Sequence, residues 1–510
     1  MAAATRQREP SDAYDLLVVG GGINGTGIAR DAAGRGLSVL LAERGDLAGF
    51  TSSSSTKLIH GGLRYLEYYE FRLVREALAE RERLLRLAPH VIWPLRFVLP
   101  HDEGLRPAWM LRLGLFLYDH LARLRTLPGS HGVDLRSSAY GAPLQKRLTR
   151  GFVYSDCWVE DSRLVVLNAM DARERGATVL TRTGVVSARR EGEGWVATLR
   201  EERGGAERTI RARAVVNAAG PWVSATLGGT LGINSRAAVR LIKGSHIVVK
   251  RLFDGDQAYI LQQPDKRIIF AIPYERDFTL IGTTDVPYDG EPGPVSISSE
   301  ETDYLCGCIN RSFDTKISPA DVVWSYSGVR PLYDDAAENA SAVTRDYVLD
   351  VEDQGGKAAV LSVFGGKITT YRRLAEHALE KLKPYFPHLK KAWTGDAVLP
   401  GGAMKDSDFD QFLAKFRAEK PFLPEETARR LARAYGTRAR DIVGTARSVA
   451  DLGETFDGGL TAAEVDYLRG EEWAVTAEDI LWRRSKLGLR TSPDSAARLA
   501  AYLDRRAAAA

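Results

Sequence analysis

The chain has 510 residues, of which 44% are hydrophobic and 27% are charged, a globular composition with room for about three domains. Its 70 basic and 66 acidic residues leave a net charge of +4, which is too balanced to indicate a nucleic acid as partner. Three cysteines without a C-x-x-C pair fit free thiols in a reducing cytosol. Because no apolar run approaches about 18 residues and no secretory signal precedes the chain's first strand, we expect no membrane-spanning helix.

After a lead over residues 1–12 that we expect to be disordered, residues 14–43 predict a strand, a glycine-rich turn, a helix and a second strand. The turn has the pattern G-x-G-x-x-G, formed by Gly20, Gly22 and Gly25. These glycines allow a tight turn, close approach of a pyrophosphate and close helix packing, and the helix N-terminus favours an anion. Glu43 ends the second strand, where its carboxylate can accept both ribose hydroxyls. The combination predicts a dinucleotide site, and an ordinary βαβ turn is the alternative.

The next segment, TSSSSTKLIHGGLRYLE over residues 51–67, is rich in hydroxyls and glycines. A flexible serine-rich linker is one interpretation, but the apolar Leu58 and Ile59 argue against disorder. The segment closely resembles the flavin-contacting segment of the FAD-dependent glycerol-3-phosphate dehydrogenases. The glycine-rich stretch before it, GGGINGTGIARDAAGRGLSVLLAE, is similar to the first motif of the same family.

Two amphipathic stretches follow. Residues 67–90 predict a long helix with a solvated charged face. Residues 105–125 combine large apolar side chains with four arginines, the composition of a helix that lies in a membrane interface. The apolar members are Trp109, Met110, Leu113, Phe116 and Leu117. A half-buried helix that caps the substrate domain is the alternative.

The rest of the chain alternates between nucleotide-binding and substrate-binding patterns. A strand over residues 178–186 and the apolar stretch AVVNAAGPW over residues 214–222 are expected near the adenine and the pyrophosphate. Short alternating strands over residues 239–284 predict an antiparallel substrate-binding layer. Residues 359–370 return to the nucleotide-binding part and end in Gly365-Gly366-Lys367 before a helix, where Lys367 is an anion candidate. Beyond residue 394 the pattern is helical with capping residues, and helices are expected over residues 424–435, 438–452, 462–469, 477–486 and 493–508.

The predicted fold class is therefore α/β: an FAD-binding, Rossmann-like fold of the two-dinucleotide-binding-domain flavoproteins, with an inserted antiparallel-sheet domain and a C-terminal all-helical domain. Residues 13–394 form the oxidoreductase region and residues 395–510 the helical domain. The FAD-binding parts are expected at about 13–85, 150–235 and 320–390, and the substrate-binding parts at about 86–149 and 236–319.

The resemblance covers almost the whole chain, including KGSH at 243–246, GTTD at 282–285 and TRDY at 344–347. It implies FAD as cofactor, oxidation of sn-glycerol 3-phosphate to dihydroxyacetone phosphate by hydride transfer to FAD, and a quinone as electron acceptor. It also implies a cytoplasmic protein bound peripherally to the inner face of the membrane, with a homodimer as one option. The lack of a His/Cys cluster at metal spacing argues against a metal enzyme, as the balanced charge argues against a nucleic acid. The cofactor contacts it implies are Gly20, Gly22, Ile23, Asn24, Gly25, Glu43, Ser52, Ser53, Thr56, Lys57, Leu58, Gly61, Gly62, Val185, Gly220, Trp222, Gly366, Lys367 and Thr369.

A phosphorylated polyol needs a cationic holder and a proton acceptor. The cations on motif segments are Arg64, Arg330, Arg345 and Lys367, for which surface salt bridges are the alternative. His246 is the predicted general base because the ordinary pKa of histidine lies near neutral pH, and a buried core histidine is the alternative. Tyr65 and Thr283 are candidates to orient the substrate hydroxyls, and Arg330 has a possible second role over the reduced flavin.

Two rival functions share these features. A glycerol-3-phosphate oxidase has the same motifs but gives its electrons to oxygen and makes hydrogen peroxide. A flavin-free binding protein on the same fold belongs to a different class, and the intact glycines, Glu43 and the Ser/Thr-Lys segment argue against it.

Overall fold

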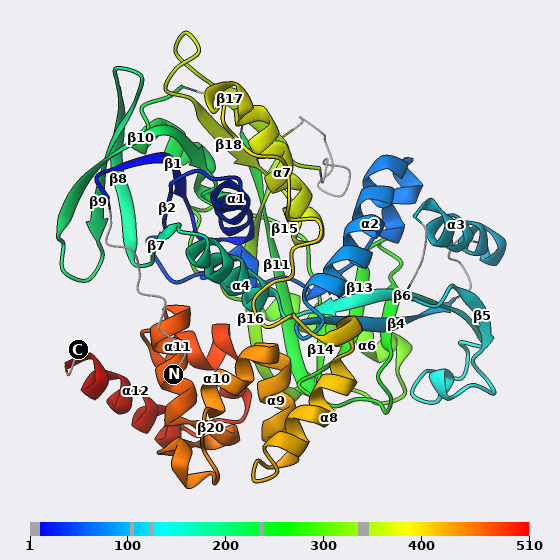
Figure 1. Cartoon of the computed structure of the whole chain (residues 1–510). Helices are drawn as coiled ribbons and strands as arrows, with labels where there is room; N and C mark the ends of the chain where they lie inside the picture. Colours follow the sequence, from blue (N-terminus) through cyan, green and yellow to red (C-terminus); the bar gives the residue numbers. More distant parts are fainter. Residues whose placement is uncertain (1–10, 103–106, 123–125, 235–237, 335–345, 509–510) are drawn as a thin grey trace.

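The computed structural model describes residues 11–102, 107–122, 126–234, 238–334 and 346–508, apart from the side chains of Arg64 and Glu67. Arg345 and the lead over residues 1–10 therefore lie outside the described residues. The described chain forms two large sheets and a helical C-terminal domain, which lies at the bottom of the view in Figure 1, beneath the first sheet and beside β14 and β16 of the second. The expected α/β class with a helical C-terminal domain is confirmed.

Within the described residues, the first sheet has eight strands in the order β17-β18-β10-β1-β2-β7, and β8 and β9 extend it as an antiparallel ribbon on β10. Its pairs from β18 to β7 are parallel. Continuous apolar runs such as LLVV in β1 suit strands that are buried on both faces. The strands are β1 (Ala13–Val19), β2 (Val39–Ala42), β7 (Thr178–Leu180), β8 (Thr183–Glu191), β9 (Gly194–Glu201), β10 (Glu207–Asn217), β17 (Val348–Glu352) and β18 (Val360–Phe364).

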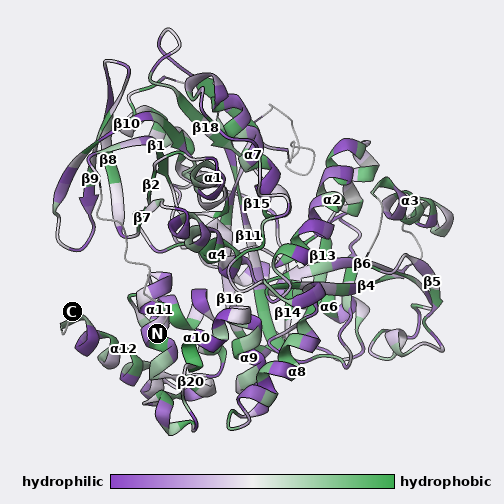
Figure 2. Cartoon of the chain, in the orientation of Figure 1, coloured by the Kyte–Doolittle hydropathy of each residue, from purple (hydrophilic) through white to green (hydrophobic). Residues whose placement is uncertain are grey.

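Three helices cover one face of the first sheet. They are α1 (Ile23–Gly34), α4 (Asp161–Glu174) and α7 (Tyr371–Leu382), and α1 packs between the other two. All three contribute to one apolar core with β1 and β2. Figure 2 shows the hydrophobic side of α7 turned toward the sheet and its hydrophilic side turned outward.

In the part of the chain that the structure describes, the second sheet has ten strands, and its longest path is β15-β11-β14-β13-β12-β4-β6-β3, with β16 on β11 and β5 on β6. Along β4, Phe97 and Val98 point to opposite faces, which α2 with α3 and α6 respectively cover. The strands are β3 (Leu58–Ile59), β4 (Ile92–His101), β5 (His131–Asp134), β6 (Arg150–Val159), β11 (Val239–Lys250), β12 (Ala258–Gln262), β13 (Ile268–Tyr274), β14 (Phe278–Gly282), β15 (Val286–Pro287) and β16 (Val322–Tyr333). The helices are α2 (Phe71–Leu87), α3 (Ala108–Leu121) and α6 (Ser299–Ser312).

The second sheet contains strands from both the FAD-binding and the substrate-binding parts expected from the sequence. β6 and β16 lie within expected FAD-binding parts, which stay predictions; β6 pairs with β4 along its whole length and β16 pairs with β11. β3, within the expected first FAD-binding part, also pairs with β6. An apolar strand carries no local signal for which of two sheets it joins, because the pairing partners lie far away in the sequence.

The C-terminal domain has its own apolar core. Its helices are α8 (Phe409–Glu419), α9 (Glu425–Tyr435), α10 (Ala439–Val443), α11 (Ala462–Glu472) and α12 (Pro493–Ala508), and it includes the π-helical turn η13 (Asp479–Arg484). The helix expected over residues 438–452 ends early, because Gly444 follows α10 with a φ of 50°. The sequence patterns did not indicate α8.

Candidate functional site

The carboxyl ends of the parallel strands form a cradle around the start of α1. A Cβ atom on Gly20 would lie 2.5 Å from the carbonyl oxygen of Ala218, and one on Gly25 would lie 1.9 Å from that of Gly20. Any larger residue at these two positions would clash with the protein's own backbone. At Gly22 the nearest described atom to a Cβ would be the mobile hydroxyl of Ser52 at 3.1 Å. The backbone is thus open beside Gly22 at a helix N-terminus, where a pyrophosphate fits.

The first turn of α1 also carries a buried acceptor without a donor. The Asn24 amide nitrogen donates to the carbonyl of Gly365 at 3.1 Å, whereas its Oδ1 is buried and has no hydrogen-bond partner among the described residues. The Ile23 N–H donates to the Ser52 hydroxyl at 3.0 Å. Because native proteins rarely leave a buried polar atom unpaired, Asn24 fits a ligand that carries hydroxyl groups, as the ribityl chain of FAD does.

Glu43 stands at the expected end of β2. Its two carboxylate oxygens accept the N–H groups of Gly21 and Gly45, each at 2.6 Å. Burial raises the pKa of Glu43, and these two amides oppose that shift. Each carboxylate oxygen has a second lone pair, so the predicted contact with the ribose remains available. The Thr183 N–H donates to the Glu43 carbonyl at 2.8 Å, which places the start of β8, and hence Val185, beside this end of the cradle.

Trp222 follows β10 at the same edge of the sheet. Its ring meets Phe50 edge-on at 4.6 Å, and the Arg44 guanidinium lies 5.1 Å from the ring centroid. Gly220, just before it, has a φ of 56° and no described atom within 4 Å of a Cβ position. This region thus has an open backbone position beside a fixed aromatic ring, and both residues remain predicted cofactor contacts.

The flavin segment, which we define as residues 51–62, runs along β16. The Thr51 hydroxyl donates to the Val329 carbonyl at 2.6 Å, and the Tyr326 hydroxyl donates to the Ser55 carbonyl at 2.8 Å. The Thr56 hydroxyl lies 3.0 Å from His246 Nε2 on β11. Ser53, another predicted cofactor contact, donates its hydroxyl to the Phe50 carbonyl. The flavin segment therefore joins the cradle to the second sheet.

The Lys57 side chain forms a buried ion pair. Its Nζ donates to Asp161 Oδ1 at 2.8 Å and to the Ser53 carbonyl at 3.1 Å, and the Lys57 and Asp161 side chains are fully buried. Burial would raise the pKa of Asp161, but the charges of Lys57 and Lys486 and the hydrogen bonds from Lys57 and Ser55 together hold that pKa below its usual range. The ammonium thus fixes the flavin segment on α4, and the contact of Lys57 with the cofactor stays a prediction. Asp161 lies 104 residues away, so no spacing rule could have indicated the pair.

Leu58 and Gly61 lie in the packed part of the flavin segment. Leu58 is buried in β3, opposite Trp158. The Gly61 N–H donates to the Tyr118 hydroxyl of α3 at 2.8 Å, and that hydroxyl donates in turn to Asp156. Burial raises the pKa of Tyr118 well above its ordinary value, so its hydroxyl stays protonated. No sequence pattern indicated that α3 contacts the flavin segment through this tyrosine.

The loop after β18 closes the other side of the cradle. The Thr369 hydroxyl accepts the His60 N–H at 3.3 Å, and a Cβ on Gly366 would lie 3.0 Å from the Asn24 amide. Lys367 Nζ lies 3.8 Å from the centroid of the Tyr65 ring. That ring sits against Gly62, which has a φ of 76°. Two predicted substrate contacts, Tyr65 and Lys367, are thus brought together.

Three further predicted residues gather on the second sheet. A Cβ on Gly244 would lie 2.9 Å from both Arg330 Nη2 and Thr283 Oγ1, so these two side chains meet over Gly244. Arg330 also forms an ion pair with Asp285 and is 30% exposed. His246 is two residues along β11 from Gly244 and therefore on the same face. The side chain of Arg64 and all of Arg345 lie outside the described residues, so their roles stay predictions.

His246 combines features of both interpretations made from the sequence. It is 2% exposed and its ring stacks on Tyr326 at 4.7 Å, as in a core histidine. Its Nδ1, however, is buried and has no hydrogen-bond partner among the described residues. Burial lowers the pKa of His246 well below its ordinary value, and the charges of Lys57 and Arg330 add to the effect. The imidazole is therefore neutral at neutral pH, the state that a proton acceptor needs.

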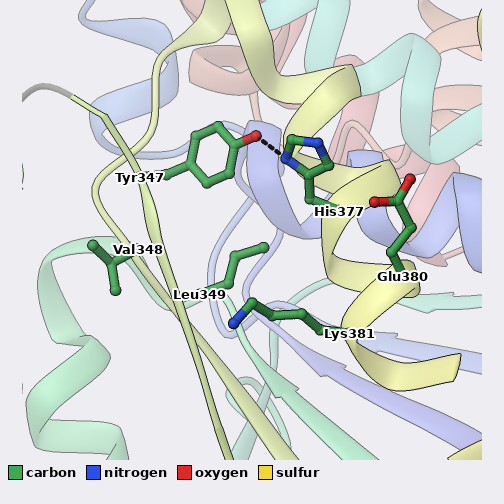
Figure 3. A pocket seen from close by; sticks show the side chains of 6 residues that line it. All are labelled: Tyr347, Val348, Leu349, His377, Glu380 and Lys381. Atoms are coloured by element: carbon green, nitrogen blue, oxygen red, sulfur yellow. Dashed lines mark hydrogen bonds between the residues drawn. The ribbon is translucent and has the colours of Figure 1, made fainter. Parts of the chain in front are cut away.

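An open hollow of about 530 Å³ lies elsewhere, between β17 and α7. Figure 3 shows its lining, in which the Tyr347 hydroxyl is hydrogen-bonded to Nδ1 of His377. Glu380 and Lys381 lie on the same helix, and no predicted site residue lines the hollow. It is therefore distinct from the cradle.

The fold and the cradle define a flavoprotein of the dinucleotide-binding oxidoreductase class. The family model of FAD dependent oxidoreductases matches residues 15–372, and the model for the C-terminal domain of alpha-glycerophosphate oxidase matches residues 392–506. The chain is 56% identical to a glycerol-3-phosphate dehydrogenase of Pseudomonas aeruginosa, over 97% of this chain and 95% of that protein. It is 53% identical to the aerobic glycerol-3-phosphate dehydrogenase of Escherichia coli, over 96% and 97%.

A third relative, a D-erythritol 1-phosphate dehydrogenase of Brucella abortus, is 55% identical over 92% of this chain and 94% of that protein. Among solved structures, the glycerol-3-phosphate dehydrogenase of Bacillus halodurans complexed with FAD superposes with a TM-score of 0.75 at 26% identity, over 98% of this chain and 95% of that one. The chain belongs to the family of aerobic FAD-dependent glycerol-3-phosphate dehydrogenases. Its cofactor is FAD, which argues against the flavin-free binding protein.

Proposed function

We propose that the chain oxidises sn-glycerol 3-phosphate to dihydroxyacetone phosphate and passes the electrons to a membrane quinone. The observation that carries the substrate assignment is the meeting of Arg330 and Thr283 over Gly244, on the sheet face that also bears His246. A guanidinium suits phosphate oxygens, and a threonine hydroxyl suits a polyol. The names of the relatives support the same substrate class.

The chain's own residues supply binding and proton transfer. The neutral imidazole of His246 accepts the proton of the substrate's C2 hydroxyl, and the arriving phosphate dianion stabilises the imidazolium that results. Arg330, Lys367 and Arg345 hold the phosphate, while Tyr65 and Thr283 orient the hydroxyls. The bound FAD supplies the hydride acceptor.

An anaerobic titration tests this proposal. Addition of sn-glycerol 3-phosphate should bleach the yellow protein stoichiometrically, whereas glycerol should do so only at far higher concentration. Truncation of Arg330 to alanine should lower kcat/KM for the phosphate by roughly 10 to 150-fold, the effect of about 1.5–3 kcal/mol. A lysine at this position should recover only part of the loss. Equal losses on glycerol and on its phosphate would contradict phosphate binding by Arg330.

D-Erythritol 1-phosphate is a second candidate substrate, because the Brucella abortus relative with that name is about as similar as the glycerol-3-phosphate dehydrogenases. Both substrates carry a phosphate and a secondary alcohol, so the residues above serve either. The ratio of kcat/KM for the two phosphates decides between them.

The membrane proposal rests on α3. Its buried side contains Leu111, Leu115 and Tyr118 and packs against α2. A half-buried helix that caps the substrate domain is therefore compatible with an outer side that binds a membrane. Its outer side exposes Trp109, Met110, Leu113 and Phe116, by 67%, 42%, 50% and 49%. Within the described ranges, no helix combines the length and apolarity needed to cross a bilayer. We infer that this outer side lies in the interface of the inner membrane face, on the cytoplasmic side.

The turn η2 (Leu63–Tyr68) packs against α3 and is followed by Tyr69, 81% exposed, which extends the apolar surface toward the flavin segment. The double variant Leu113→Glu, Phe116→Glu should release the protein from phospholipid vesicles while activity with a soluble dye persists. Val323→Glu with Val398→Glu is the matched control, because both valines are exposed elsewhere. Release by the control pair alone would contradict the assignment.

The electron acceptor separates the proposal from the oxidase. A dehydrogenase should reduce a quinone analogue and leave oxygen largely unconsumed. Stoichiometric formation of hydrogen peroxide that quinone does not suppress would decide for the oxidase.

A further inference from the structure

The C-terminal domain meets the adenosine end of the cradle through a buried ion-pair cluster. Arg484 donates from both terminal nitrogens to the two carboxylate oxygens of Asp46, each at 2.7 Å, and Arg483 Nε donates to Asp46 at 2.6 Å. The Arg484 side chain is fully buried and that of Asp46 is 3% exposed. Both arginines belong to η13, and Asp46 follows β2.

A second contact of η13 holds the neighbouring strand. Asp479 accepts the N–H groups of Val475 and Thr476 and the Arg182 guanidinium, which lies 2.7 Å away. Burial alone would raise the pKa of Asp479, but these donors outweigh it and lower that pKa to about 2. Arg182 lies in the turn between β7 and β8. The same carboxylate also binds Arg483, so the two contacts form one cluster.

Asp46 and Arg182, the two partners of η13, belong to the loops that hydrogen-bond Glu43. The Gly45 N–H donates to Glu43 Oε1 at 2.6 Å, and the Gly45 carbonyl accepts the Arg182 N–H at 2.8 Å. The Thr183 N–H donates to the Glu43 carbonyl. The C-terminal domain therefore binds Asp46, which directly follows Gly45, and Arg182, which directly precedes Thr183. Gly45 and Thr183 are the residues that hydrogen-bond Glu43.

We propose that the C-terminal domain is an adenosine clamp, in which Arg484, Arg483 and Asp479 are positioning residues for FAD retention. Buried ion pairs contribute little net stability, because desolvation offsets their attraction, but their geometry fixes the groups that they join. Fixing the loops of Glu43 and Thr183 before FAD arrives removes an ordering cost from FAD binding. This role goes beyond the proposed reaction and does not depend on which polyol phosphate is the substrate.

The test compares FAD release from Arg484→Lys and Arg182→Gln holoproteins with that from the parent. Release is followed by the rise of free flavin fluorescence after dilution, and ADP binding to the apoproteins reports the adenosine end alone. Both variants should release FAD at least about tenfold faster and bind ADP more weakly by a similar factor. The gap between the melting temperatures of holoprotein and apoprotein should shrink, whereas a purely structural role would lower both temperatures equally.

Arg438→Gln is the matched control, because Arg438 joins the same domain to Glu174 of α4 at 2.6 Å, away from Glu43. It should release FAD at the parental rate. If Arg484→Lys does not fold, Arg182→Gln carries the test, because its guanidinium is partly exposed at the domain boundary. Release rates within about twofold of the parent in the folded variants, or an equal acceleration in Arg438→Gln, would overturn the proposal.

Discussion

The two alanine substitutions Gly22→Ala and Gly25→Ala should separate the demands of the cofactor from those of the fold. A methyl group on Gly25 would lie 1.9 Å from the Gly20 carbonyl oxygen, so the turn between β1 and α1 must open. We expect a loss of about 3 kcal/mol or more in stability, as for severe overpacking. A methyl group on Gly22 meets only the Ser52 hydroxyl at 3.1 Å. Rotation of that hydroxyl gives up its hydrogen bond from Ile23, worth about 1 kcal/mol.

Gly22→Ala should therefore yield a folded apoprotein that holds FAD poorly. The methyl group occupies the open side of the helix N-terminus, and displacement of the pyrophosphate should remove about 1.5–3 kcal/mol of charge-assisted hydrogen bonding. This energy corresponds to a roughly 10 to 150-fold weaker affinity for FAD, which fluorescence titration of the apoprotein measures. Thermal melting of the apoproteins measures the fold. Parental FAD affinity in Gly22→Ala, or a parental melting temperature in Gly25→Ala, would refute the steric argument.

Three further predictions concern buried polar groups. Burial and neighbouring arginine charges lower the pKa of His90 to about 3, so the unfolded chain takes up this proton first as the pH falls. Stability should therefore drop by about 2 kcal/mol between about pH 6.5 and 5, and His90→Gln should remove this part of the drop in denaturant titrations. His246→Gln should slow flavin bleaching by about 100-fold while substrate still binds; an unchanged rate with a lower melting temperature would mark His246 as structural. Tyr118→Phe leaves Gly61 and Asp156 without the tyrosine hydroxyl and should cost about 1–3 kcal/mol in denaturant titrations, unless water replaces the hydroxyl.

The parts of the site that could be predicted are those encoded by short local patterns. The glycine-rich turn and Glu43 lie within one βαβ unit, so spacing alone places them at the same edge of a sheet. The flavin segment has no such periodicity, and the resemblance to a family indicated its role. Its hydroxyls are in fact divided between α1, reached by Ser52, and the second sheet, reached by Thr56.

The parts that could not be predicted depend on long-range pairing. The buried ion pair of Lys57 was not expected, because its partner Asp161 lies 104 residues away. The pair of Asp46 and Arg484 spans 438 residues. Similarly, the local sequence of β6 does not indicate which sheet it joins, and ten residues of pairing with β4 place it in the second sheet. Residue type and local spacing do not indicate such long-range contacts.

The flavin segment couples the position of the cofactor-binding part of this chain to that of the substrate-binding part. Within five residues it binds the first turn of α1 through Ser52 and the face of the second sheet through Thr56 and His246. Between them, Ser55 holds Tyr326 and also donates to Asp161, which anchors Lys57. One short peptide therefore sets the separation between the anion site of the nucleotide and the imidazole proposed to take the substrate proton. A chain that needs a hydride donor placed against a bound cofactor gains a fixed separation from this arrangement, because neither sheet can shift without breaking hydrogen bonds to the same segment.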